Sequence, residues 1–186
     1  MKFLVLLSGC GLGDGSQIEE VMLTYLVLDK YGAEYDPAAV DMIATGVNHL
    51  TEKTEGLRNV LAESARIGRG RIKNLAEVDL DQYDGLIIPG GIGLLTSYKE
   101  SSIVHETLQD FYRNRKPILG MCSAIALLKK HISPIIFKQF AETIGAKGNV
   151  FDGDFNTYYT PAFRASQDMY EVLQGIDSMI RAVVDD

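Results

Sequence analysis

The residue best suited to do chemistry in this sequence is Cys122, within the segment Gly-Met-Cys-Ser-Ala at positions 120–124. An apolar run, Pro117–Gly120, precedes it, and a helical pattern, Ser123–Lys130, follows it directly. This order of strand, sharp turn and helix is that of a nucleophile elbow, in which small flanking residues let a strained turn close. The elbow would place the sulfur at a helix N-terminus, where the dipole and unpaired N–H groups lower the pKa of the thiol. The alternative is that Cys122 is simply a small buried apolar side chain.

A nucleophile of this kind needs donors for the oxyanion that forms when it attacks a carbonyl group. The run Pro89-Gly90-Gly91 ends a neighbouring apolar stretch, and it could turn the backbone N–H groups of Gly90 and Gly91 toward the sulfur. The N–H of Ser123, directly after the cysteine, would be a further donor. The alternative for the two glycines is a plain glycine turn.

The nucleophile also needs a base, and the three histidines are poor candidates for it. His131 lies nine residues beyond Cys122 on the same predicted helix, about 13 Å along its axis, so it cannot touch the sulfur. His49 and His105 could approach only through the fold, and His105 fits the surface of an amphipathic helix. Glu20 is the better candidate, because a carboxylate that shares a proton with the thiol has a raised pKa and can transfer protons near neutral pH. The alternative for Glu20 is an exposed acid in the first turn of a helix.

The elements that must position these residues alternate between strand-like and helix-like patterns. Ser16-Gln17-Ile18-Glu19 fits a capping box, so a helix is expected to begin there and to stop at Gly32. We expect strands at Phe3–Ser8, Glu34–Val40, Gly85–Ile88, Pro117–Gly120 and Asn156–Thr160. We expect the other helices at Leu57–Ile67, Ser102–Arg113, Ser123–Lys130, Phe137–Ile144 and Ser166–Val184, the last with a break near Gly175.

This alternation predicts right-handed crossovers between parallel strands, and therefore a three-layer αβα sandwich with a mainly parallel sheet. The sequence shows no repeat and no linker, so residues 1–186 are expected to form a single domain. Ligands of such sheets bind at the carboxyl ends of the strands, where the loops 9–15, 89–93 and 120–123 would meet. Cys10, in the first of these loops, could then act as a resolving thiol for Cys122.

Composition excludes several classes of function. The chain has 186 residues, of which 46% are hydrophobic and 23% charged, which is typical of a globular protein. Its net charge of −7 argues against a nucleic-acid partner, and no apolar stretch approaches the roughly 18 residues of a membrane span. Two cysteines provide neither a disulfide framework nor a metal-binding spacing, which fits a cytoplasmic protein without a metal.

Several of these segments together resemble the ThiJ/PfpI superfamily, whose members are relatives of the class I glutamine amidotransferases. The resemblance rests on Glu20 five residues after Gly15, on Pro89-Gly90-Gly91, and on Cys122 two residues after Gly120. Shorter segments resemble the enhancing-lycopene-biosynthesis (ElbB) branch, also described as isoprenoid biosynthesis proteins with an amidotransferase-like domain. They are Ser8-Gly9-Cys10-Gly11, Asp14-Gly15, Asn48-His49-Leu50-Thr51, Arg58-Asn59-Val60-Leu61, Ala65-Arg66-Ile67, Arg69-Gly70 and Thr160-Pro161-Ala162.

The resemblance implies a flavodoxin-like fold, a homodimer, and a reactive Cys122 that is hydrogen-bonded to Glu20. It also implies a weak glyoxalase activity without a cofactor, acting on small aldehydes such as glyoxal and methylglyoxal. Cys10, from its place at the same sheet edge, and His49, if the fold brings it there, are the candidates for residues around the site. No histidine follows His131, so a glutaminase is not expected, and Ser123 stands where PfpI-type peptidases carry histidine. The alternative function is a redox sensor or regulatory protein linked to isoprenoid metabolism, in which Cys122 is oxidised.

Overall fold

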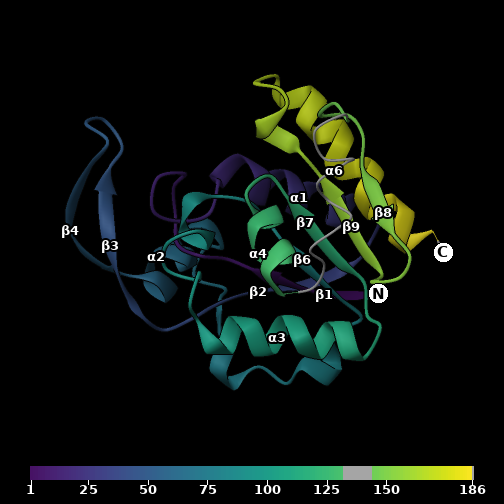
Figure 1. Ribbon diagram of the computed structural model, residues 1–186, viewed down its shortest axis with the longest axis horizontal. Coiled ribbons are helices and arrows are strands. Elements are labelled where there is room, and N and C mark those ends of the chain that lie inside the picture. The colour runs from purple at the N-terminus through teal and green to yellow at the C-terminus, as the bar shows by residue number, and fades with distance from the viewer. Residues whose placement is uncertain (132–143, 186) are drawn as a thin grey trace.

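A seven-stranded sheet forms the centre of the computed structural model, which describes residues 1–131 and 144–185 (Figure 1). Its strands lie in the order β5-β2-β1-β6-β7-β9-β8. Six of them are parallel: β1 (Lys2–Leu6), β2 (Glu34–Ala39), β5 (Lys73–Asn74), β6 (Gly85–Ile88), β7 (Ile118–Met121) and β9 (Thr157–Thr160). The seventh, β8 (Val150–Asp152), pairs antiparallel with β9 and was not expected from the sequence. The central strands are apolar and buried along their whole length, as parallel strands covered on both faces must be.

Helices cover both faces of the sheet. On one face, α1 (Ile18–Lys30) contacts both α2 (Val60–Ile67) and α6 (Met169–Val184). On the other face, α3 (Ser102–Arg113) contacts α4 (Ala124–His131). Figure 1 shows α3 on the opposite side of the sheet from α1 and α6. The predicted αβα sandwich with a mainly parallel, flavodoxin-like sheet is therefore confirmed.

A β-hairpin stands away from this body (Figure 1). It is formed by β3 (Ile43–Asn48) and β4 (Lys53–Asn59), which pair antiparallel as a separate two-stranded sheet. We call residues 43–59 the arm. The prediction of a helix over Leu57–Ile67 is wrong for its first three residues, because Leu57 pairs with Thr45 of β3. The helix begins at Val60, after Asn59, whose side chain accepts a hydrogen bond from the backbone N–H of Ala62.

The structure corrects two further predictions, one about the start of α1 and one about a break inside the last helix. Ser16 does not cap α1: its hydroxyl oxygen accepts a hydrogen bond from the backbone N–H of Ser8, and the residue before the helix is Gln17, which makes no side-chain cap. The last helix has no break, because α6 passes through Gly175 without interruption. The predicted helix at residues 137–144 lies outside the described residues except for its last position.

Candidate active site

The predicted elbow is present between β7 and α4. Cys122 has a φ angle of +53°, in the left-handed region that side chains other than glycine rarely adopt. Its N–H donates to the carbonyl oxygen of Thr160 at 3.1 Å, and its own carbonyl oxygen accepts from the hydroxyl of Tyr159 at 2.9 Å. A side chain at Gly120 would come within 2.6 Å of the Leu128 methyl carbon Cδ1, so a small residue is required there. The packing around the elbow thus holds the strained residue in place.

Glu20 lies in the first turn of α1 and is completely buried, so the alternative of an exposed acid is wrong. Its Oε2 atom accepts a hydrogen bond of 2.7 Å from the N–H of Gly90. The carboxylate also lies within hydrogen-bonding reach of the Cys122 thiol. Gly90 makes this approach possible, because a β-carbon there would lie 2.7 Å from Oε2 and 2.6 Å from the Cys122 β-carbon. The structure therefore brings the two residues expected to do the chemistry into one buried pair.

Burial decides the protonation of this pair. It raises the pKa of the Glu20 carboxyl to about 7, although hydrogen bonds from Gly90 and Cys122 act in the opposite direction. Burial, together with the negative charge of Glu20, also raises the pKa of the Cys122 thiol to about 12. The lowered thiol pKa predicted from the helix N-terminus is thus wrong, because loss of hydration outweighs the hydrogen bond from the N–H of Ser123. The thiol keeps its proton at neutral pH and has a carboxylate beside it that can accept that proton.

The three backbone donors predicted for an oxyanion are not equally free. The N–H of Gly90 is used by Glu20, and the N–H of Gly91 donates to the hydroxyl oxygen of Ser123 at 2.7 Å. The Ser123 hydroxyl in turn donates to the carbonyl oxygen of Gly91 at 2.8 Å. Only the N–H of Ser123, of these three, is directed at the sulfur of Cys122. The expectation that both glycine N–H groups face the reacting atom is corrected accordingly.

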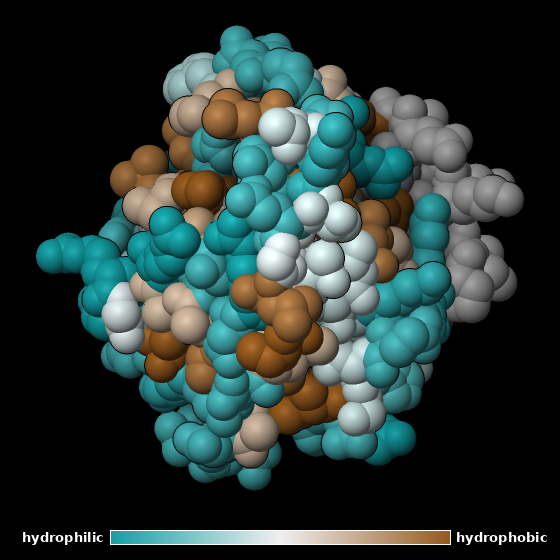
Figure 2. Space-filling view, turned by 90° about the vertical axis from the view of Figure 1, so that its left-hand side faces the viewer, coloured by the Kyte–Doolittle hydropathy of each residue, from teal (hydrophilic) through white to brown (hydrophobic). Residues whose placement is uncertain are grey.

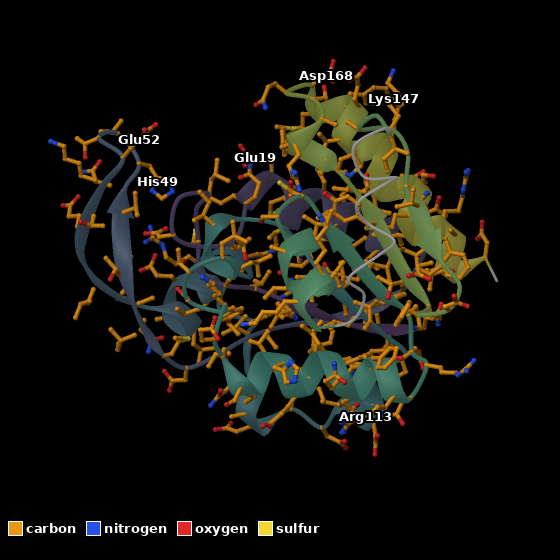
Figure 3. All side chains as sticks on the ribbon, viewed as in Figure 1. Glu19, His49, Glu52, Arg113, Lys147 and Asp168 are labelled. Carbon is orange, nitrogen blue, oxygen red and sulfur yellow. The ribbon has the colours of Figure 1, made fainter. Side chains whose placement is uncertain are left out.

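His49 contacts the first loop, as does the arm that carries it (Figure 3). Its Nε2 atom accepts from the N–H of Gly13 at 3.1 Å, while Nδ1 lies 3.1 Å from the carbonyl oxygen of Val47. The half-buried Cys10 lies among the charges of α2 and the loop, and burial raises the pKa of its thiol. None of these contacts involves Cys122, so a role for Cys10 or His49 beside the nucleophile stays a prediction.

Sequence reasoning missed two residues that reach the elbow from the end of β9. Tyr159 is buried and bonds the Cys122 carbonyl oxygen, as described above. Arg164 lies in the short 3-10 helix η4 (Ala162–Arg164), where its side chain hydrogen-bonds Tyr159 and its positive charge lowers the pKa of the Cys122 thiol. The strand itself was predicted, and its carboxyl end marked the correct edge of the sheet. No motif pointed to these two side chains.

The space around the sulfur is small. Cys122 is 8% exposed, whereas a cavity of about 610 Å³ lies at the amino ends of β1 and β2, with Lys2, Tyr35 and Arg71 in its walls. That cavity is at the opposite edge of the sheet from the elbow and has no part in its chemistry.

Among the residues that the structure describes, no cluster of three or more His, Cys, Asp or Glu side chains could hold a metal ion. The arrangement suits a small reactant that approaches a thiol with an adjacent base.

Fold and site together define an α/β protein of the class I glutamine amidotransferase-like type, with a cysteine on its nucleophile elbow. Residues 10–134 match the DJ-1/PfpI family, and the chain belongs to that family. The predicted ThiJ/PfpI relationship is thereby confirmed.

Known proteins similar to this chain support the same assignment. A rat protein called "ES1 protein homolog, mitochondrial" is 29% identical, over 99% of this chain and 83% of its own length. The human "Glutamine amidotransferase-like class 1 domain-containing protein 3, mitochondrial" is also 29% identical, over 99% of this chain and 82% of its own.

Within the part of this chain that the structure describes, no helix is long and apolar enough to cross a membrane.

Among solved structures, the isoprenoid biosynthesis protein with amidotransferase-like domain from Ehrlichia chaffeensis superposes with a TM-score of 0.91 at 25% identity. The match covers 100% of this chain and 98% of that one, and it confirms the predicted branch of the superfamily. Drosophila melanogaster DJ-1beta has a TM-score of 0.62 at 17% identity, over 100% of this chain and 91% of that one, and so shares the fold.

Proposed function

We propose that this protein is a cysteine-dependent glyoxalase that converts small 2-oxoaldehydes, such as glyoxal and methylglyoxal, to hydroxy acids without a cofactor. One observation carries the proposal: the Cys122 thiol and the Glu20 carboxylate form a buried pair, and the pKa of the carboxyl is raised to about 7. A base with a pKa near the working pH is the most effective proton carrier, because it accepts and releases protons with similar ease.

The reaction needs no external oxidant or reductant. Glu20 takes the thiol proton while the Cys122 sulfur adds to the aldehyde carbon, and it passes that proton to the carbonyl oxygen, which becomes the hydroxyl of a hemithioacetal. Glu20 then removes the hydrogen on that carbon as a proton and delivers it to the neighbouring carbonyl oxygen, which gives an enediol. The proton of the first hydroxyl group then moves, through Glu20, to the second carbon. This oxidises the first carbon to a thioester and reduces the second to an alcohol. Water attacks the thioester, releases the hydroxy acid and returns the proton to the sulfur.

The surroundings of the sulfur fit this sequence of steps. The Ser123 N–H at the sulfur and the positive charge of Arg164 both favour negative charge there, and so oppose the cost of forming it in a buried site. The low exposure of Cys122, at 8%, favours reactants of two or three carbons over larger aldehydes. Because the N–H groups of Gly90 and Gly91 are occupied by Glu20 and Ser123, we expect the activity to be weak.

The proposal is tested by following hydroxy-acid formation from glyoxal and from methylglyoxal by nuclear magnetic resonance. We expect Cys122→Ser to abolish turnover and Glu20→Gln to reduce it by about 100-fold or more, the usual contribution of a positioned general base. Glu19→Gln is the matched control, since it makes the same change at the half-buried neighbouring position. Absence of turnover in the parent protein, or full turnover in Cys122→Ser, would refute the proposal.

A second candidate, redox sensing, is favoured by a different observation. The Oε1 atom of Glu20 is buried and accepts no hydrogen bond of good geometry among the described residues, although the backbone N–H of Phe163 lies near the carboxyl. A protonated carboxyl could donate from this atom to an oxygen bound to sulfur. In that function a thiol and two molecules of peroxide would give a sulfinic acid and two molecules of water.

Redox sensing predicts that mild peroxide adds the mass of two oxygen atoms to Cys122 as a stable product. Mass spectrometry of parent and Glu20→Gln protein would show it, with less product in the variant. Recovery of the unmodified cysteine, or oxidation beyond the sulfinic acid at the same rate in both proteins, would contradict it.

We also propose a cytoplasmic location, supported by two cysteines that are both free thiols, as a reducing compartment keeps them. Fractionation of the source cells with an antibody to this chain would decide it. A link to isoprenoid metabolism is supported by the name of the Ehrlichia chaffeensis protein alone.

A further inference from the structure

A cavity lined by charged and aromatic side chains lies at the amino ends of β1 and β2, and the chemistry proposed above does not use it. Its volume is about 610 Å³, within the range of pockets that bind small molecules. Figure 2 looks onto the other edge of the sheet, the one that carries the arm, where hydrophobic patches are scattered among polar residues. The lining of the cavity differs from that surface, because its aromatic side chains alternate with groups of both charges.

The cavity exists because β2 lacks an outer neighbour along its first half. The edge strand β5 has only two residues, and they pair with the end of β2. Beside the first half of β2, the loop that runs from Gly68 to Ile72 forms the outer wall instead. The N–H of Gly70 donates to the carbonyl oxygen of Ala65 at 2.9 Å, which fixes this loop to the end of α2. The N–H of Arg71 donates to the carbonyl oxygen of Gly68 at 3.0 Å, so the backbone sets the position of Arg71.

One hydroxyl group in the wall of the cavity has no partner. Tyr25, on α1, is 8% exposed, and its buried hydroxyl makes no hydrogen bond with the described residues. A buried hydroxyl without a partner costs free energy, so its presence calls for an explanation. The ring of Tyr25 stacks on that of Tyr35, with the ring centroids 4.8 Å apart, and Tyr35 is half-buried at the cavity. A polar ligand group beside this pair would give the hydroxyl the partner that it lacks.

The guanidinium group of Arg71 lies near both of these tyrosines. Burial raises the pKa of the Tyr25 and Tyr35 hydroxyls, while the positive charge of Arg71 lowers it. The Tyr35 hydroxyl donates to the carboxylate of Asp29, whereas Arg71 forms no ion pair with an acidic side chain in the described part of the chain. A guanidinium group suits the paired oxygens of a carboxylate or phosphate. Because the Arg71 side chain is exposed, it can adjust so that one such oxygen meets both the guanidinium and the Tyr25 hydroxyl.

Two lysines add positive charge to the same cavity. The carboxylate of Asp36 accepts a hydrogen bond of 2.8 Å from the Nζ of Lys73 and lies 3.1 Å from the Nζ of Lys2. Two ammonium groups at one carboxylate leave one positive charge in excess. Glu34, another acid of the wall, is exposed, so solvent and salt screen its charge. An anionic group inside the cavity is therefore attracted by these lysines as well as by Arg71.

We propose that this cavity binds a small organic anion in which a flat ring carries a carboxylate or a phosphate group. The anionic oxygens lie between Arg71 and the hydroxyl of Tyr25, and the ring packs against Tyr35, extending the stack that the two tyrosines begin. The site is at the opposite edge of the sheet from Cys122, so the proposal does not depend on the glyoxalase activity. Binding here by Cys122→Ser, or turnover without binding here, would separate the two proposals.

Titration of the nitrogen-15-labelled full chain, followed by nuclear magnetic resonance, tests the site. Benzoate and phenyl phosphate carry both the ring and the anionic group, and they distinguish a carboxylate from a phosphate. Benzyl alcohol has the ring alone, and acetate and inorganic phosphate have the charge alone. We expect benzoate or phenyl phosphate to give saturable shifts at the amides of Gly68, Gly70 and Arg71, and the other three probes to bind about ten-fold more weakly or less. No saturation by either ring anion up to about 10 mM, or equal binding of benzyl alcohol, would overturn the proposal.

Replacing Tyr25 with phenylalanine separates a ligand-binding hydroxyl from a structural one. Since the hydroxyl has no partner to lose, Tyr25→Phe should leave the urea midpoint of unfolding as high as in the parent. Binding of the ring anion should weaken by about five-fold, the usual effect of one lost hydrogen bond. A lower midpoint with unchanged binding would show that the hydroxyl serves the fold, and would overturn its assignment to the ligand.

Replacing Arg71 with glutamine tests the charge. Arg71→Gln should weaken binding by about ten-fold or more, because the charge-assisted hydrogen bonds to the anion are lost. Arg69→Gln is the matched control, since it makes the same change in the same loop at a residue outside the wall of the cavity. An equal loss in both variants would mean that only the general charge of the loop attracts the probe, and it would refute the site.

Discussion

Replacing Glu20 with glutamine should change how the stability of the protein depends on pH. The carboxyl has an ordinary pKa of 4.5 when exposed in the unfolded chain and a pKa of about 7 in the folded protein. The folded state therefore holds its proton more tightly, and stability is lost as the pH rises through this interval. Glutamine has the same shape and no charge, and its amide oxygen can still accept from the N–H of Gly90.

The size of the effect follows from the two pKa values. At about 1.36 kcal/mol per pH unit, the interval between 4.5 and about 7 corresponds to about 3 kcal/mol above neutral pH. The greater part of it, about 2 to 3 kcal/mol, appears between about pH 5 and about pH 8. The parent should lose this amount relative to Glu20→Gln over that range, so that the variant becomes the more stable protein at the higher pH.

Urea unfolding of both proteins at these two pH values measures the difference directly. The comparison is best made with Cys122→Ala in both proteins, because the thiol is the other ionisable group of the pair. Glu19→Gln serves as the control for a change of charge at the neighbouring position. Parallel stability curves for the parent and Glu20→Gln would refute the reasoning, since they would mean that burial of this carboxyl carries no cost.

Two further predictions concern the close approach at the elbow and the base of the arm. Gly90→Ala should destabilise the protein by about 1–3 kcal/mol, because its β-carbon would lie 2.6 Å from that of Cys122. The same β-carbon would lie 3.2 Å from the sulfur, so alkylation of Cys122 should become slower. Gly145→Ala, with open space around its β-carbon, is the control, and equal urea midpoints for the two variants would contradict the packing described. Asp14→Asn should weaken the contact to the Val47 N–H, so that this amide exchanges about ten-fold faster. An unchanged rate would mean that the arm is held by other contacts.

The sheet was predictable because its strands are buried on both faces. Runs such as Gly85–Ile88 and Ile118–Met121 are apolar throughout, and such runs can be recognised as buried strands from the sequence alone. The arm lacks it, since β4 is exposed over most of its length and contains a glycine. Leu57 fits the helical period that continues into α2, and only its pairing with Thr45 places it in a strand.

The site was predictable in its residues but not in its electrostatics. Cys122 and Glu20 follow strands at the same edge of a parallel sheet, and this alone brings them near each other. The pKa of the thiol depends on how completely the fold removes water from the sulfur. This loss of hydration raises the pKa by more than the N–H group at the helix N-terminus lowers it, and no sequence pattern reveals it. The Gly91 N–H is occupied because the Ser123 hydroxyl turns toward it, and sequence cannot specify a side-chain rotamer.

The two outermost strands of the sheet have a consequence for solubility. β5 has two residues and carries Lys73, and β8 has three residues and ends at Asp152. Strands this short, with charged side chains, present few backbone groups on which a foreign strand could add, which is how natural sheets resist growth into fibrils. The edges of this sheet should therefore not act as templates for association of folded molecules. Growth of the seven-stranded sheet would have to begin from unfolded chains, where apolar runs such as Phe3–Leu7 become exposed.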